Sequence, residues 1–206
     1  MSEKSFDFNE FIAGSIKSLQ NPREYFSEMK TSGGFVEPLI KALIYGLVAG
    51  IIYYVWVLAG LNIAGVGPFG ASAVGVMAIF GTLFASLIGL FIGGVIMLIF
   101  SAICSGSTDY EANVRVTASM MVLTPINAIF GFLIAVSPAL STIVGLLINA
   151  YGLWMIYNAL TQSLKAKESS VKVLVIVLLV VVVFFTLLGL LVGAFFSAAE
   201  SYHPNF

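Results

Sequence analysis

Five long apolar runs constrain this chain more than any other feature of its sequence. They cover roughly residues 38–61, 74–103, 113–136, 139–161 and 171–197. A membrane-spanning helix needs about 20 mostly apolar residues to cross about 30 Å of hydrocarbon, and each run is long enough. With 60% hydrophobic and 9% charged residues and a mean hydropathy of +1.06, the chain lies outside the range of water-soluble domains. The sequence therefore predicts an all-α fold, a polytopic membrane bundle of five transmembrane helices.

The segment before the first run predicts two short amphipathic helices. Five residues of the stretch 7–20 share one face at helical spacing, namely Phe8, Phe11, Ile12, Ser15 and Leu19. Asn21 is a good N-cap and Pro22 a good first position for a second helix. Two placements fit this pattern. The helices either lie on the cytosolic membrane surface with their aromatic side inward, or pack on the cytosolic face of the bundle.

The basic residues predict the orientation in the membrane. All nine lysines and arginines lie before the first run, at its start, after the second run, or between the fourth and the fifth. Cytosolic loops are enriched in these residues, so we expect the N-terminus in the cytosol and the C-terminus outside. Residues 1–37 then form a unit of cytosolic or interfacial helices, and residues 38–206 form the five-span domain.

The turn between the second and third runs carries the only charges in the middle of the chain. Thr108 and Glu111 fit a capping box, which predicts a helix start there. Glu111 and Arg115 are four residues apart in the favourable order for an ion pair. We consider two interpretations, which are compatible. The turn is a solvated helix start, or Asp109, Tyr110, Glu111 and Arg115 form a cytosolic docking surface for a partner.

The third and fourth runs are joined by so short a turn that we expect antiparallel neighbouring helices. Small and polar residues form a stripe on each run, and their levels match as Thr117 with Asn158, Thr124 with Gly152, Asn127 with Asn149, and Gly131 with Gly145. We expect a close helix seam in which the two central asparagines share a hydrogen bond. Pro125 frees the carbonyl of Met121 and kinks the span, leaving Thr124 or a neighbouring helix to satisfy that carbonyl.

Small residues also recur every four positions in the other runs. They are Ala42, Gly46 and Gly50 in the first, Gly81, Ala85, Gly89 and Gly93 in the second, and Gly189 and Gly193 in the fifth. Such spacing lets two helices approach closely. We expect packing seams within the chain, with a homo-oligomer as the alternative.

The sequence lacks the residue groupings that catalysis or cofactor binding would need. His203, the sole histidine, lies in a tail on the opposite side from the cytosolic carboxylates, and Cys104, the sole cysteine, has no metal-ligand spacing. No lysine follows the glycines as it would in a phosphate-binding loop. The net charge of −1 argues against nucleic-acid binding. We therefore expect no enzyme activity, no cofactor, no metal and no nucleic-acid partner.

Several motifs resemble those of the Yip family, the Ypt/Rab-interacting-protein domain family of five-span membrane proteins. They are NPREYFSEM before the first run, EPLIKAL at its start, GSTDYEANVRV after the second, Pro125 within the third, and VGLLINAYGLWMIYNAL in the fourth. The resemblance covers about residues 20–197 and implies a five-span bundle. Eukaryotic members bind prenylated Rab-type GTPases. This chain lacks their longer N-terminal region and their Asp-Leu-Tyr-Gly-Pro motif, and it resembles bacterial or archaeal members, which implies a prokaryotic cell membrane.

Two functional hypotheses follow. The first is a non-enzymatic multi-pass protein that organises membrane or recruits a cytosolic or membrane protein partner through its cytosolic face, where the charges gather. The second is a small transporter or channel for an unknown solute, favoured by the polar residues within the spans.

Overall fold

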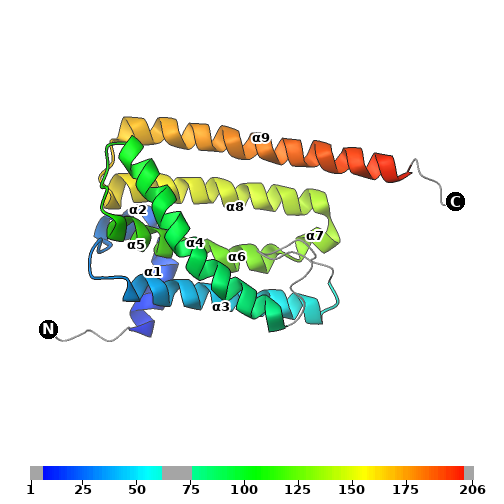
Figure 1. The fold of residues 1–206 in the computed structure, drawn as a ribbon, viewed down its shortest axis with the longest axis horizontal. Coiled ribbons are helices and arrows are strands. Elements are labelled where there is room, and N and C mark those ends of the chain that lie inside the picture. Colours follow the sequence, from blue (N-terminus) through cyan, green and yellow to red (C-terminus); the bar gives the residue numbers. More distant parts are fainter. Residues whose placement is uncertain (1–6, 62–75, 202–206) are drawn as a thin grey trace.

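The computed structural model describes residues 7–61 and 76–201, and every regular element within these ranges is helical (Figure 1). In chain order the elements are α1 (Phe8–Gln20), α2 (Pro22–Glu28), α3 (Val36–Leu58), α4 (Val76–Ile103), α5 (Tyr110–Met120), α6 (Leu123–Phe130), α7 (Leu133–Val136), α8 (Pro138–Asn158), the π-helical turn η2 (Ala159–Ser163) and α9 (Glu168–Ser201). Five segments are long and apolar enough to cross a membrane, which confirms the predicted bundle: Val36–Leu58, Ile79–Ile103, Tyr110–Val136, Pro138–Ser163 and Glu168–Gly193. The expected start of the second span, at residue 74, lies outside the described residues.

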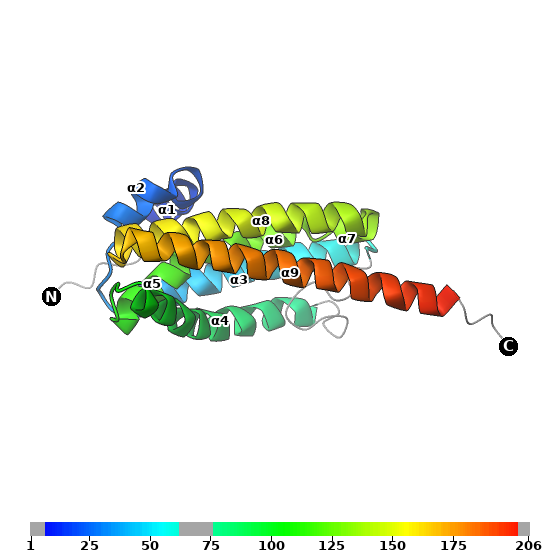
Figure 2. The ribbon, with the colours of Figure 1, turned by 90° about the horizontal axis from the view of Figure 1, so that it is seen from above.

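The spans run along the long axis of the molecule, and α1 and α2 lie at one end of it (Figure 1). α6 lies between α3 and α8, and α4 crosses α3 at an angle. Seen from above, α4 lies on one side of the bundle and α1 and α2 lie on the other (Figure 2). We call the end that holds α1, α2 and the turns 29–35, 104–109 and 164–167 the charged end. α9 runs beside α8 and extends beyond the other helices at the opposite end (Figure 1).

Side-chain caps start both N-terminal helices, and of the two caps Asn21 is the one expected from the sequence. The carboxylate of Asp7 accepts the N–H groups of Asn9 at 2.9 Å and Glu10 at 3.2 Å, which starts α1. The side chain of Asn21 caps α2, with Pro22 in the first turn. These are local interactions that a short helix needs, since its first N–H groups have no partner within the helix.

α1 and α2 pack on the bundle, which is one of the two placements expected. Phe11 and Phe26 belong to the buried core. The hydroxyl of Ser15 lies 2.7 Å from the hydroxyl of Tyr45 on α3. The opposite side of α1 stays apolar and exposed, with Phe8, Ile12 and Ile16 exposed by 56%, 42% and 49%. One helix thus offers one face to the protein and a second apolar face to its surroundings.

The third span is broken near its middle by Pro125. A proline has no N–H, so the carbonyl of Met121 loses the partner that an unbroken helix would supply. The backbone N–H of Thr124 bonds that carbonyl instead, at 2.9 Å. α5 therefore ends at Met120, and α6 starts at Leu123, two residues before the proline.

A second break separates α6 from α7 at Gly131. The N–H of Gly131 donates to the carbonyl of Ala128, three residues back, at 3.1 Å. The indole of Trp56 on α3 donates to the same carbonyl at 2.9 Å, and its ring lies 5.1 Å from that of Phe132. Irregular backbone at membrane depth is tolerated where the protein itself supplies partners, and Trp56 does so here.

Small residues allow close helix contacts at two of the expected seams. A Cβ added at Gly50 of α3 would lie 2.9 Å from the Cα of Ile79 on α4, and a Cβ at Gly93 of α4 would lie 2.7 Å from a methyl group of Thr117 on α5. The fifth span differs, because a Cβ at Gly189 would have no atom within 4 Å. The small residues of α3 and α4 therefore serve packing within the chain, whereas Gly189 has room beside it.

We expect Gly50→Ala to lower the free energy of unfolding by about 1–3 kcal/mol, because the new methyl group meets backbone of α4 that cannot rotate away. Thermal unfolding of the purified protein in detergent measures this change. Gly189→Ala is the matched control and should leave stability unchanged or slightly raised. An equal loss in both variants would show that the α3–α4 contact is not the cause.

Candidate functional site

A buried arginine holds the charged end together. Arg115 on α5 is 5% exposed. Its Nε donates to the carbonyl of Lys30 and its Nη1 to the carbonyl of Gly34, both at 2.9 Å, while its Nη2 bonds the carboxylate of Glu37. Glu111, one turn earlier on α5, accepts the N–H of Gly34 at 2.6 Å. The third span thus fixes the turn that leads from α2 into α3.

A line of polar side chains continues from Glu37 across the neighbouring helices. Glu37 forms an ion pair with Lys41 at 2.8 Å. The Nζ of Lys41 donates to the hydroxyl of Tyr25 on α2 at 3.4 Å, and that hydroxyl lies 2.9 Å from the hydroxyl of Ser119 on α5. Charges removed from water persist where they are paired and hydrogen-bonded, and this line satisfies that condition.

The turns after the second and fourth spans are joined through their backbones. The N–H of Ser107 donates to the carbonyl of Leu164, and the N–H of Lys167 donates to the carbonyl of Cys104, both at 2.8 Å. Gly106 allows this approach, because a Cβ there would lie 3.0 Å from the carbonyl oxygen of Leu164. The two turns therefore form one surface.

The π-helical turn at the end of the fourth span connects this surface to α2. The N–H of Leu164 donates to the carbonyl of Ala159, five residues back, at 3.1 Å. Ser163, within the turn, donates its hydroxyl to the carbonyl of Phe26 on α2 at 2.6 Å. π-helical turns are rare and occur often at functional sites. We call the surface formed by residues 22–30, 104–109 and 164–167 the composite face.

The composite face carries exposed cations. Within the described ranges, Arg23, Lys165 and Lys167 are exposed and form no ion pair. Lys17 on α1 is different, since it lies 2.8 Å from Glu24 and 2.7 Å from Glu28. Hydrogen bonds to these two carboxylates raise the pKa of Lys17. Exposed cations that form no ion pair remain available to an outside partner.

The expected capping box takes a different form. Asp109, not Thr108, caps α5, and its carboxylate accepts the N–H of Glu111 at 3.2 Å. The carboxylate of Glu111 does not return to the cap, because the turn 33–34 folds over it and presents the N–H of Gly34. The hydroxyl of Tyr110 donates to the carbonyl of Phe91 on α4 at 3.2 Å.

The expected ion pair between Glu111 and Arg115 is replaced by the pair between Arg115 and Glu37. Arg115 lies inside the protein, beneath the surface that Asp109 reaches. Glu37, Tyr25 and Ser119, which belong to the polar line of the charged end, were not among the site residues expected from the sequence. The spacing of Glu37 and Lys41, four residues apart, is a signal for their ion pair, whereas nothing local connects Glu37 to Arg115.

The expected hydrogen bond between Asn127 and Asn149 is absent from the described structure. The amide of Asn127 donates to the carbonyl of Leu123 at 3.0 Å, and the amide of Asn149 donates to the carbonyl of Gly145 at 2.9 Å. Each asparagine bonds a carbonyl four residues earlier on its own helix. That carbonyl is always within reach, whereas a partner on another helix requires close helix approach.

The stripe on the third and fourth spans forms a close seam at one level and is open at another. A Cβ added at Gly152 would lie 3.3 Å from the side chain of Leu123, but one added at Gly145 would have no atom within 4 Å. Thr117 and Asn158 are both buried, and the methyl group of Thr117 lies against Gly93 on α4. The break at Gly131 leaves a cavity beside Gly145.

The described residues contain no group of three or more histidine, cysteine or acidic side chains that could hold a metal ion. Cys104 is fully buried, and this burial raises the pKa of its thiol. A buried, protonated thiol is a poor nucleophile.

We expect Arg115→Gln to lower the free energy of unfolding by about 2–4 kcal/mol, because it leaves two carbonyls without a donor and leaves Glu37 paired only with Lys41. Hydrogen exchange in lipid should become faster mainly in residues 29–37. Arg23→Gln, which removes an exposed unpaired cation, is the control and should change neither quantity. Unchanged exchange in Arg115→Gln would contradict the role assigned to this side chain.

Comparison with known families agrees with this architecture. A family model described as the Yip1 domain matches residues 16–191, which covers α2 through most of α9 and part of α1. Comparison with curated proteins and with solved structures finds no match. The family match contains the first four membrane segments, all but the last two residues of the fifth, and the turns of the charged end. The chain belongs to the Yip1 domain family of multi-pass membrane proteins.

Proposed function

We propose that this protein is a non-enzymatic membrane protein that organises membrane by recruiting a partner protein to its composite face. The observation that carries the proposal is the way this face is built. Backbone hydrogen bonds join its two turns, Ser163 connects them to α2, and Arg115 fixes the segment that follows α2. Segments far apart in sequence are thus held as one surface.

The charges of the face favour an acidic partner. Arg23, Lys165 and Lys167 are exposed and carry no ion pair within the described residues. Complementary charge speeds association and selects among partners, and such contacts need no catalytic residue. Asp109 and Tyr110 form the edge of this docking surface, with Glu111 and Arg115 holding it from beneath.

The face is proposed to lie in the cytosol, with the N-terminus on the same side and the C-terminus outside, in a prokaryotic cell membrane. All nine basic residues of the chain lie before the first span, near its start, in the turns of the charged end, or within the first six residues of α5 or α9. Cytosolic loops are enriched in lysine and arginine.

The alternative function, a small transporter or channel, receives less support. Polar residues in the spans motivated it, but Thr117 and Asn158 are buried and donate to the carbonyls of Asn113 and Trp154 on their own helices. Each of these two buried side chains thus has a hydrogen-bond partner on its own helix.

A photoreactive amino acid at position 165 tests partner recruitment. Irradiation of native membranes should give one discrete adduct, and the same amino acid at position 139, at the opposite end, should give none. Changing Arg23 and Lys167 to Gln should lower the adduct yield about fivefold. This corresponds to a loss of roughly 1 kcal/mol of binding free energy, as expected for partly exposed charges. Lys172→Gln is the control, because Lys172 already pairs with Glu168 at 2.8 Å. Absence of any adduct from position 165 contradicts recruitment, and an adduct only with a second copy indicates a homo-oligomer.

Cysteine labelling tests the orientation. Cys104 is fully buried, so the unmodified protein should not react with a membrane-impermeant maleimide. Ser169→Cys, exposed in the first turn of α9, should react only when the cytosolic side is accessible, and Ala139→Cys only from outside. The reverse pattern in intact cells and inverted vesicles would reject the proposed orientation.

A further inference from the structure

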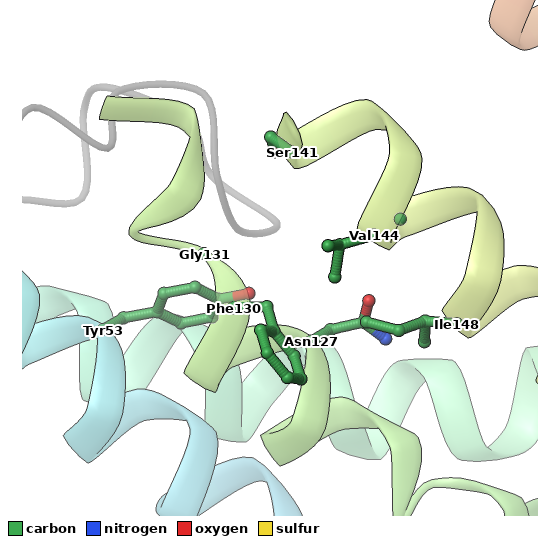
Figure 3. A pocket seen from close by; sticks show the side chains of 8 residues that line it. Tyr53, Asn127, Phe130, Gly131, Ser141, Val144 and Ile148 are labelled. Atoms are coloured by element: carbon green, nitrogen blue, oxygen red, sulfur yellow. The ribbon is translucent and has the colours of Figure 1, made fainter. Parts of the chain in front are cut away.

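A cavity of about 170 Å³ lies between α3, α6 and α8, in the half of the bundle away from the charged end. Tyr53 reaches into it from α3, Asn127 from α6, and Ser141 and Gly145 line it from α8 (Figure 3). It forms where the third span breaks at Gly131 and where Gly145 has no side chain to fill the space. The opening is at membrane depth, because all of these residues belong to membrane-spanning segments.

The cavity contains hydrogen-bond donors without partners. Among the residues that the structure describes, nothing bonds the hydroxyl groups of Tyr53 and Ser141. Asn127 uses one amide hydrogen on the carbonyl of Leu123, and its second is free. The neighbouring Thr142 shows the usual solution, since its hydroxyl donates to the carbonyl of Pro138 at 2.9 Å. Polar groups left unpaired in hydrocarbon are costly, so these donors indicate a ligand.

The depth of the donors identifies the part of a lipid that they would meet. Ser141 is three residues from the start of α8, about 5 Å at 1.5 Å per residue, and Tyr53 is five residues from the end of α3, about 8 Å. We take the end of α3 and the start of α8 as the border of the hydrocarbon, which is about 30 Å thick. The hydroxyl groups of Tyr53 and Ser141 therefore lie just inside that border, where the ester groups of a glycerolipid join its acyl chains. Asn127 lies deeper, nine residues before the end of α7.

We propose that this cavity binds an ester-linked glycerolipid of the leaflet opposite the charged end. An ester carbonyl accepts hydrogen bonds and donates none, so it matches a site that offers hydroxyl and amide donors. The volume equals about five to six water molecules at about 30 Å³ each, which fits a carbonyl group and the first carbons of one chain and excludes a whole lipid. The rest of the lipid lies along the exposed surface of α8.

Photoactivatable phosphatidylglycerol with a diazirine close to its ester group tests the proposal with the full-length protein in vesicles. The readout is the ratio of adducts on residues 127–148 to adducts on α9, which serves as an internal reference for bulk lipid. The diester probe should give a ratio at least about threefold above that of a diether probe with the same head group, as expected for one or two hydrogen bonds. Equal ratios for the two probes overturn the proposal.

Two pairs of variants distinguish binding in the cavity from labelling by lipid elsewhere on the protein. Tyr53→Phe combined with Ser141→Ala should abolish the preference for the diester, and Thr142→Val should retain it. Gly145→Leu should remove the adducts on residues 127–148 by filling the cavity, and Gly189→Leu on α9 should not. Unchanged adducts in Gly145→Leu, with thermal stability like that of the unmodified protein, overturn the proposal.

Discussion

The guanidinium group of Arg115 is the interaction on which the charged end depends. A guanidinium has N–H donors fixed in one plane, so it can bind several acceptors at once only if they surround it. Here the acceptors come from Lys30, Gly34 and Glu37, which precede Arg115 by about eighty residues in the chain. Burying this charge would be unfavourable without them. The N-terminal segment is for this reason a packed part of the domain.

Elsewhere the bilayer sets the rule that polar backbone must find partners inside the protein. The two breaks of the third span follow it, the first through the N–H of Thr124 and the second through the indole of Trp56. Side chains follow it too where they can, by donating to a carbonyl on their own helix. The hydroxyl groups of Tyr53 and Ser141 do not follow it. The composite face lies outside the membrane-spanning segments, so the rule does not apply there. Both proposed contacts with other molecules lie at these exceptions.

Local patterns in the sequence were enough to predict the spans and the N-terminal helices. Hydrocarbon thickness acts on each apolar run separately, and the caps Asp7 and Asn21 act within one turn. The partners of Arg115 could not be predicted in this way, because Glu111 is an equally good partner by spacing and Glu37 lies far away in sequence. The predicted hydrogen bond between Asn127 and Asn149 was wrong for a related reason. Matching levels say that two residues can meet, but the kink and break of the third span decide whether they do.

The position of α9 bears on how the chain is assembled during synthesis. Val171 near its start is buried in the core, whereas the membrane-spanning part from Glu168 to Gly193 buries almost nothing else. The core shared by the first four spans and the N-terminal helices thus needs little more than the first turn of α9. It can form while the ribosome is still making the fifth helix, so folding can keep pace with insertion. The last helix then enters the bilayer beside a folded domain. It adds a further contact with the membrane and little packing against the other spans.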